Sequence, residues 1–158
     1  MITPSTLDTS TRARWPLASA LPPLGALPSV PGTIRAHVDL VLAEWQMGNL
    51  ADTAKLVASE LVTNAVKEST TPEGDPIYAN GQMPLIWVCL LSDRSNLMIE
   101  VHDQAGGWPV MQDAGPDAVS GRGLPMINAL TGGQWGWNPK IGRPGKCVWA
   151  LLLCGSPR

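Results

Sequence analysis

Apolar residues recur along this chain with two periods, and these periods predict its elements. Between Thr33 and Gly48 the apolar residues follow at spacings of four, three and four, which is typical of a helix with one buried side; they are Ile34, Val38, Val41 and Trp45. Pro31-Gly32-Thr33 is its expected start, with Thr33 as the candidate N-cap, and Gly48-Asn49 is its expected end. A second apolar stripe predicts a helix over 51–68, formed by Ala54, Val57, Ala58, Leu61 and Ala65.

Strand patterns follow in the second half of the chain. Short apolar segments separated by turn residues predict strands over 85–91, 97–101, 134–137 and 147–153. A short helix is expected over 124–130, and the Pro-rich segment 15–31 is expected to run as an extended arm against the domain. This order predicts an α+β two-layer sandwich, with a mixed, mostly antiparallel sheet covered on one face by helices.

The length of 158 residues fits one domain with its own core. We expect a flexible N-terminus over 1–14, a single folded domain over 15–153 and a C-terminal tail over 154–158. Two stretches, 69–83 and 104–120, carry turn residues without periodicity. Irregular connections of this length are usually functional or mobile.

Composition narrows the functional class. The net charge is -2 and the basic residues are scattered, which argues against nucleic-acid binding. The three cysteines show no metal-site spacing, and Cys89 and Cys147 lie in apolar runs, which fits reduced thiols in the cytoplasm. Four prolines within 15–28 argue against a signal peptide, and no run reaches the ~20 apolar residues of a membrane span.

A stripe of polar residues on the second helix is the first candidate for chemistry. Glu60, Asn64 and Lys67 stand at i, i+4 and i+7, so their side chains fall within roughly 60° of one another on a helix. A carboxylate, a carboxamide and an ammonium in this order can serve as a general base, a magnesium ligand and a phosphate partner. The alternative is a solvated helix face, because polar residues extend the same arc: Lys55, Ser59 and Thr63.

Two further motifs follow the predicted strands. Asp103 ends an apolar strand directly before Gln-Ala-Gly-Gly (104–107), where a carboxylate can accept a hydrogen bond from an exocyclic amine; an ordinary turn is the alternative. Gly121, Arg122 and Gly123 open the short helix, where free N–H groups favour phosphate. This second motif is a weak signal alone, but the order and separation of all three motifs are specific.

Together these motifs resemble those of the GHKL ATPase superfamily. Residues 60–66 resemble its N-box, 103–107 its first glycine box and 121–124 its second, while 145–150 resembles the last strand of one branch. That branch contains bacterial anti-sigma factor serine/threonine kinases and related ATP-binding regulators of actinomycetes. The resemblance spans about residues 30–153 and implies the GHKL ATPase (histidine-kinase-like) fold.

The resemblance also implies cofactors and roles. The cofactors are ATP and Mg²⁺, with Asn64 as the metal ligand, Glu60 as the base that activates a hydroxyl and Asp103 as the residue that recognises adenine. Further nucleotide contacts are implied for Lys67, Gly107, Gly121, Arg122, Gly123 and Cys147. Cys147 stands where relatives commonly have Thr.

The function implied by the resemblance is transfer of the ATP γ-phosphate to Ser or Thr of an anti-anti-sigma protein. The implied partners are that protein and a sigma factor, in the cytoplasm, and a homodimer is common among relatives. A non-catalytic partner-binding regulator with weak or no nucleotide binding is the alternative. It is favoured by departures from the family pattern: Glu68 replaces a common His, Ala105 replaces a glycine, and 104–120 contains no Lys or Arg.

Overall fold

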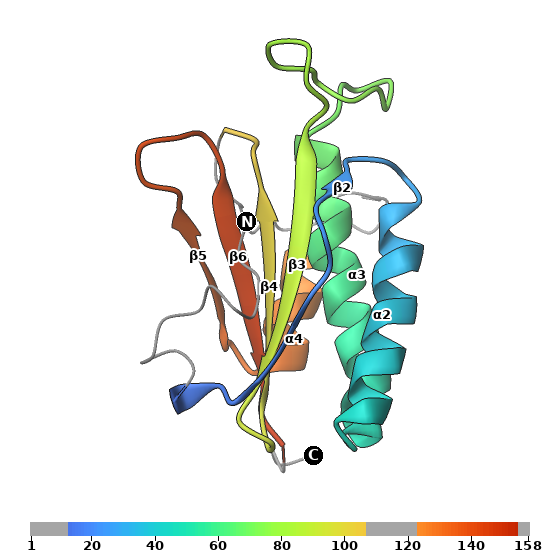
Figure 1. Cartoon of the computed structure of the whole chain (residues 1–158), viewed down its shortest axis with the longest axis vertical. Coiled ribbons are helices and arrows are strands. Elements are labelled where there is room, and N and C mark those ends of the chain that lie inside the picture. The colour runs from blue at the N-terminus through green and yellow to red at the C-terminus, as the bar shows by residue number, and fades with distance from the viewer. Residues whose placement is uncertain (1–12, 107–122, 155–158) are drawn as a thin grey trace.

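A computed structural model describes residues 13–106 and 123–154 of the chain. Its helices are α2 (Val30–Glu44), α3 (Ala51–Glu68) and α4 (Gly123–Thr131), with the 3-10 turn η2 (Gly48–Leu50) between the first two. Its strands are β1 (Leu17–Ala20), β2 (Leu24–Gly25), β3 (Leu85–Ser92), β4 (Leu97–Asp103), β5 (Trp135–Pro139) and β6 (Lys146–Leu152) (Figure 1).

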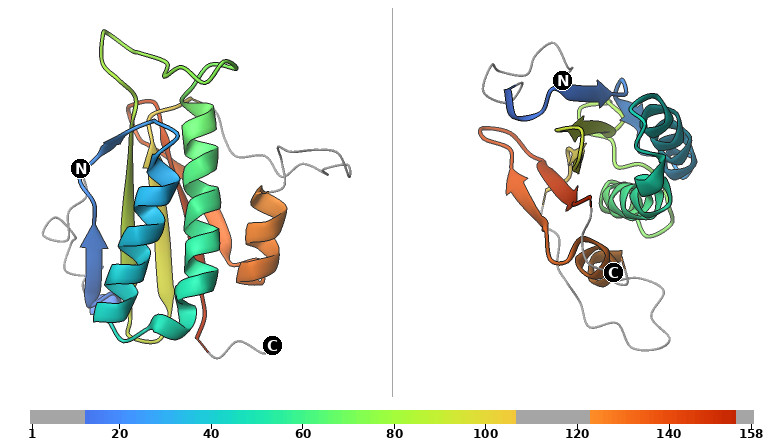
Figure 2. Two further views of the ribbon diagram at one scale, coloured as in Figure 1. Left: turned by 90° about the vertical axis from the view of Figure 1, so that its right-hand side faces the viewer. Right: turned by 90° about the horizontal axis from the view of Figure 1, so that it is seen from below.

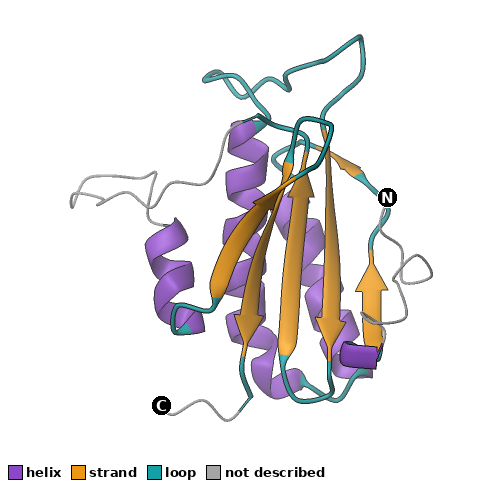
Figure 3. Cartoon of the chain, turned by 90° about the vertical axis from the view of Figure 1, so that its left-hand side faces the viewer, coloured by secondary structure: helices purple, strands orange, loops and turns teal. Residues whose placement is uncertain are grey.

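The strands form a sheet in the order β1-β3-β4-β6-β5, and β2 pairs with the other end of β3. Every strand pair in the described part of the chain is antiparallel. The helices α2, α3 and α4 lie on one side of this sheet (Figures 2 and 3). The predicted α+β class with an antiparallel sheet is therefore confirmed.

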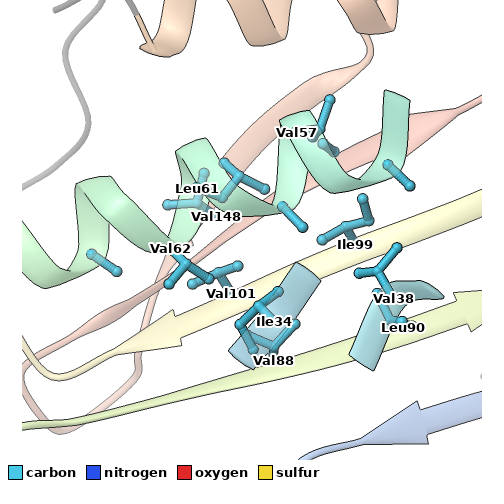
Figure 4. Packing of buried hydrophobic residues seen from close by; sticks show 14 of the residues in the cluster. Ile34, Val38, Val57, Leu61, Val62, Val88, Leu90, Ile99, Val101 and Val148 are labelled. Atoms are coloured by element: carbon cyan, nitrogen blue, oxygen red, sulfur yellow. The ribbon is translucent and has the colours of Figure 1, made fainter. Parts of the chain in front are cut away.

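Alternation along the strands gives the sheet two different faces. In β4, Ile99 and Val101 point toward the helices and belong to the main core, whereas Met98 packs in a separate small cluster with Trp15 and Cys89. The main core joins side chains of α2, α3 and the inner sheet face. The residues labelled in Figure 4 belong to it: Ile34, Val38, Val57, Leu61, Val62, Val88, Leu90, Ile99, Val101 and Val148.

The predicted ends of the first helix were wrong. It begins at Val30, one residue before the predicted Pro31-Gly32-Thr33 start, and its N-cap is Ser29 rather than Thr33. Pro31 suits the first turn, because proline's fixed φ is helical and its missing N–H would have no helical acceptor there. It ends at Glu44, and Gly48 opens η2 instead of stopping the helix. The second helix spans 51–68 as predicted.

The other predicted elements are present with small shifts. The extended arm forms β1 and β2, and it ends where α2 begins. The predicted short helix is α4, one residue longer at each end. In the described ranges, no helix is long and apolar enough to cross a membrane. Residues 1–12 and 155–158, and most of the segment 104–120, lie outside the described residues.

Candidate functional site

The polar stripe of α3 meets the first residue of α4. A Cβ atom added to Gly123 would lie 2.9 Å from Oε2 of Glu60 and 3.2 Å from Nδ2 of Asn64. Glycine therefore permits a helix N-terminus to approach these two side chains closely, and any larger residue would displace them. The structure thus brings together three of the residues predicted for the site.

Asn64 and Asp103 line the same small cavity on the helix-facing side of the sheet. Its volume is about 10 Å³, and its walls come from α3, β4, α4 and β6. The lining residues are Leu61, Asn64, Ala65, Glu68, Asp103, Leu124, Lys146 and Val148. The polar stripe of α3 and the end of β4 therefore meet at this cavity.

A buried lysine closes this cavity. Lys146 is only 1% exposed, and it stands directly across from Asp103 in the pairing of β4 with β6. Its Nζ lies 2.9 Å from Oδ2 of Asp103 and also forms an ion pair with the carboxylate of Glu68. Burial alone would lower the pKa of Lys146, but its interactions with both carboxylates raise it above its usual value, so the ammonium stays charged.

This ion pair determines what the cavity can accept. Both Asp103 carboxylate oxygens are engaged, since Oδ1 accepts a hydrogen bond of 3.0 Å from the N–H of Ala105. A volume of about 10 Å³ is at the lower limit for a single water. A purine at Asp103 therefore requires Lys146 to move.

Sequence reasoning missed Lys146 and left Glu68 without a role. The signal that could have revealed Lys146 is its position two residues before Val148 in a strand with alternating faces, since both then point to the core. Its second partner, Glu68, lies 78 residues earlier in the chain. Glu68 is thus an ion-pair partner in this protein.

A larger pocket of about 560 Å³ lies beside the cavity, at the end of α3 and β4. The segment 69–83 supplies part of its wall, and Gln104, Ala105 and Gly106 supply another. Glu68 lines both the cavity and the pocket. A movement that separates Lys146 from Glu68 would therefore act at the boundary between the two spaces.

Cys147 does not join this group. Strand alternation directs it to the sheet face opposite Asp103, where it stands across from His102 in the strand pairing. Its Sγ lies 3.6 Å from Oε2 of Glu100, which is on that same outer face. This placement does not fit the expected contact between Cys147 and a nucleotide near Asp103.

The remaining predicted contacts are distributed as follows. Lys67 is exposed near the end of α3 and is not among the residues that line the cavity. Gly107, Gly121 and Arg122 lie outside the described residues, so their predicted contacts stay predictions.

Comparison with known proteins adds no assignment. The chain matches no protein-family model and no curated protein. The GHKL resemblance therefore rests on the sequence motifs within 60–66, 103–107, 121–124 and 145–150.

Proposed function

We propose that this chain is an ATP-binding regulatory protein of the GHKL type, with the activity of the anti-sigma factor serine/threonine kinases. It would transfer the γ-phosphate of ATP to Ser or Thr of an anti-anti-sigma partner. The observation that supports this most strongly is that Asn64 of α3 and Asp103 of β4 line one cavity, while Gly123 at the start of α4 lies close to Asn64. The helices on one face of an antiparallel sheet are in keeping with the GHKL arrangement.

Each residue has a role that suits its chemistry. The carboxamide oxygen of Asn64 is a hard ligand suited to Mg²⁺, which neutralises phosphate charge when bound. Glu60 lies one helical turn earlier and is positioned to accept the proton of an attacking hydroxyl. The N-terminus of α4 favours phosphate through its free N–H groups.

In this proposal Lys146 controls access to Asp103. Its ammonium must leave the carboxylate before an adenine amine can take that place. Because Glu68 lines both the cavity and the larger pocket, breaking its ion pair with Lys146 would widen the site toward that pocket. Nucleotide binding would therefore be coupled to the opening of the ion pairs of Lys146.

A second candidate function is a partner-binding regulator without phosphotransfer. The observation that favours it is the same ion pair: Asp103 is already engaged by Lys146, and the cavity holds only about 10 Å³. In such a protein the ion pair would simply be part of the core.

The two functions are distinguished by binding and transfer measured separately. Calorimetric titration should show that the wild-type protein binds Mg-ATP. Asn64→Ala should lose the part of this affinity that depends on magnesium. Ser59→Ala on the same helix is the control, because Ser59 contacts Arg35 of α2 instead. Glu60→Ala should keep binding, since a base acts mainly in the transition state, but should lower phosphotransfer to a partner by about 10²–10⁴-fold.

Each outcome decides between the proposals. If the wild-type protein binds Mg-ATP and labels no candidate partner, the kinase proposal fails and the binding regulator stands. If Glu60→Ala transfers phosphate at the wild-type rate, Glu60 is not the base. If Mg-ATP does not bind at all, both the nucleotide site and the kinase activity are excluded.

A further inference from the structure

A second group of polar side chains lies on the sheet face that the helices leave uncovered. Glu100 and His102 stand two residues apart in β4, so both point to this outer face. Cys147 of β6 is directly across from His102 in the strand pairing. One ligand atom from each of the three residues lies within 4.8 Å of the others. Two alternate residues of one strand and one cross-strand neighbour thus form a compact triangle.

We propose that Glu100, His102 and Cys147 form a binding site for a divalent transition metal, with Zn²⁺ as the best-fitting ion. Carboxylate oxygen, imidazole nitrogen and thiolate sulfur are the ligand types that zinc takes in proteins. Mg²⁺ and Ca²⁺ prefer oxygen ligands, so a thiol and an imidazole select against both. Three protein ligands leave a fourth tetrahedral position open to water or another small ligand.

The burial of His102 is an independent observation that supports this site. The residue is 5% exposed, and its Nε2 has no hydrogen-bond partner in the described part of the chain. Its ring stacks on Trp87 with 5.7 Å between ring centroids and an angle of 2° between planes. The stacked indole holds the imidazole plane, so the ligand is oriented before metal binds.

Cys147 and Glu100 supply the two ligands that are negatively charged when a metal is bound. The Cys147 thiol donates to Oε2 of Glu100 at 3.6 Å. A cation placed among the three ligands would displace that thiol proton to solvent, forming a metal–thiolate bond and leaving the carboxylate free to coordinate. Metal binding is therefore expected to release one proton for each ion bound. This site lies on the opposite sheet face from Asn64 and is independent of the proposed nucleotide function.

The test is metal titration of the full chain after treatment with a chelator. Calorimetry with Zn²⁺ should show one site, and Co²⁺ should give the absorption of a thiolate-bound ion. Comparing buffers of different ionisation enthalpy should reveal the released proton. Cys147→Ser should weaken Zn²⁺ binding by about tenfold or more and remove the thiolate absorption. Cys154→Ser is the matched control, because Cys154 is an exposed thiol on the same chain.

The results that would overturn the site are equally specific. Absence of Zn²⁺ binding to the wild-type protein excludes it, as does unchanged binding in a folded Cys147→Ser variant. If Cys154→Ser causes the same loss, the metal binds elsewhere. Should Cys147→Ser fail to fold, Glu100→Gln at a partly exposed position is the second variant, and wild-type affinity in that variant also excludes the site.

Discussion

Lys146 lies buried between two carboxylates, although lysine is rarely buried in proteins. Replacing it by Ala would leave Asp103, which is 1% exposed, without its counter-ion. Removing one partner of a buried pair costs about 3–5 kcal/mol, so we expect Lys146→Ala to lower the free energy of unfolding by that amount in urea titration. Lys55→Ala, at an exposed ion pair with Asp39, should cost much less. Equal losses of unfolding free energy in the two variants would mean that the buried pair stabilises the fold no more than an exposed ion pair does.

Gly123 is the residue at which added bulk tests the candidate nucleotide site. Its hypothetical Cβ would contact the flexible ends of Glu60 and Asn64, so Gly123→Ala should leave the fold intact and displace both side chains. We expect weaker Mg-ATP binding in calorimetry. Gly48→Ala is the control, because within the described residues nothing lies within 4 Å of a Cβ added there. Equal affinity in Gly123→Ala and wild type would contradict the proposed site.

One substitution at Cys147 tests the proposed sites on both faces of the sheet. Because its side chain points to the outer face, Cys147→Thr should leave Mg-ATP affinity unchanged, while it removes the thiolate ligand and weakens Zn²⁺ binding. Both affinities can be measured by calorimetry on the same preparation. A tighter complex with Mg-ATP would show that residue 147 acts on the nucleotide side after all.

At the scale of elements, strand β4 connects the core with both candidate sites. Its residue Ile99 is fully buried between the sheet and the helices. Ile99→Ala should cost about 2–5 kcal/mol of unfolding free energy, because it removes buried methyl groups and leaves a cavity. The measurement is urea denaturation with an unchanged m-value. Met98→Ala, on the half-buried outer face, should cost less; a larger loss there would place the main core on the wrong side of the sheet.

At the scale of the whole molecule, one sheet separates two sites of different chemistry. Asp103 and Lys146 point toward the helices, whereas the neighbouring His102 and Cys147 point away from them. We expect Asn64→Ala to lose magnesium-dependent nucleotide binding and to bind Zn²⁺ with wild-type affinity. Calorimetry of both ligands on that variant is the measurement. A parallel loss of both affinities would mean that the two sites share one element or that the fold has changed.

Local patterns in the sequence determined where most elements lie. The apolar stripe over 51–68 predicted α3, and the apolar segments of the second half predicted four strands of the sheet, because burial on one side imposes periods of 3.6 and 2 residues. The start of α2 was predicted to within one residue, but its cap was wrong, because the pattern favoured Thr33 while the helix takes Pro31 and Thr33 into its first turn. Helix spacing placed Glu60 and Asn64 on one face of α3, whereas their roles as base and metal ligand come from the resemblance and stay predictions.

Only the tertiary structure decided which polar residues meet. The strand register places Lys146 opposite Asp103, and α3 brings Glu68 to the same ammonium from 78 residues away. The same register turns Cys147 away from Asp103 and joins it with Glu100, 47 residues earlier. Periodicity specifies that alternate residues share a face, but it does not specify which residue of another strand lies across. That pairing depends on the register of the whole sheet and on the burial of its core. The ion pair at the candidate nucleotide site and the three proposed metal ligands therefore follow from the tertiary structure.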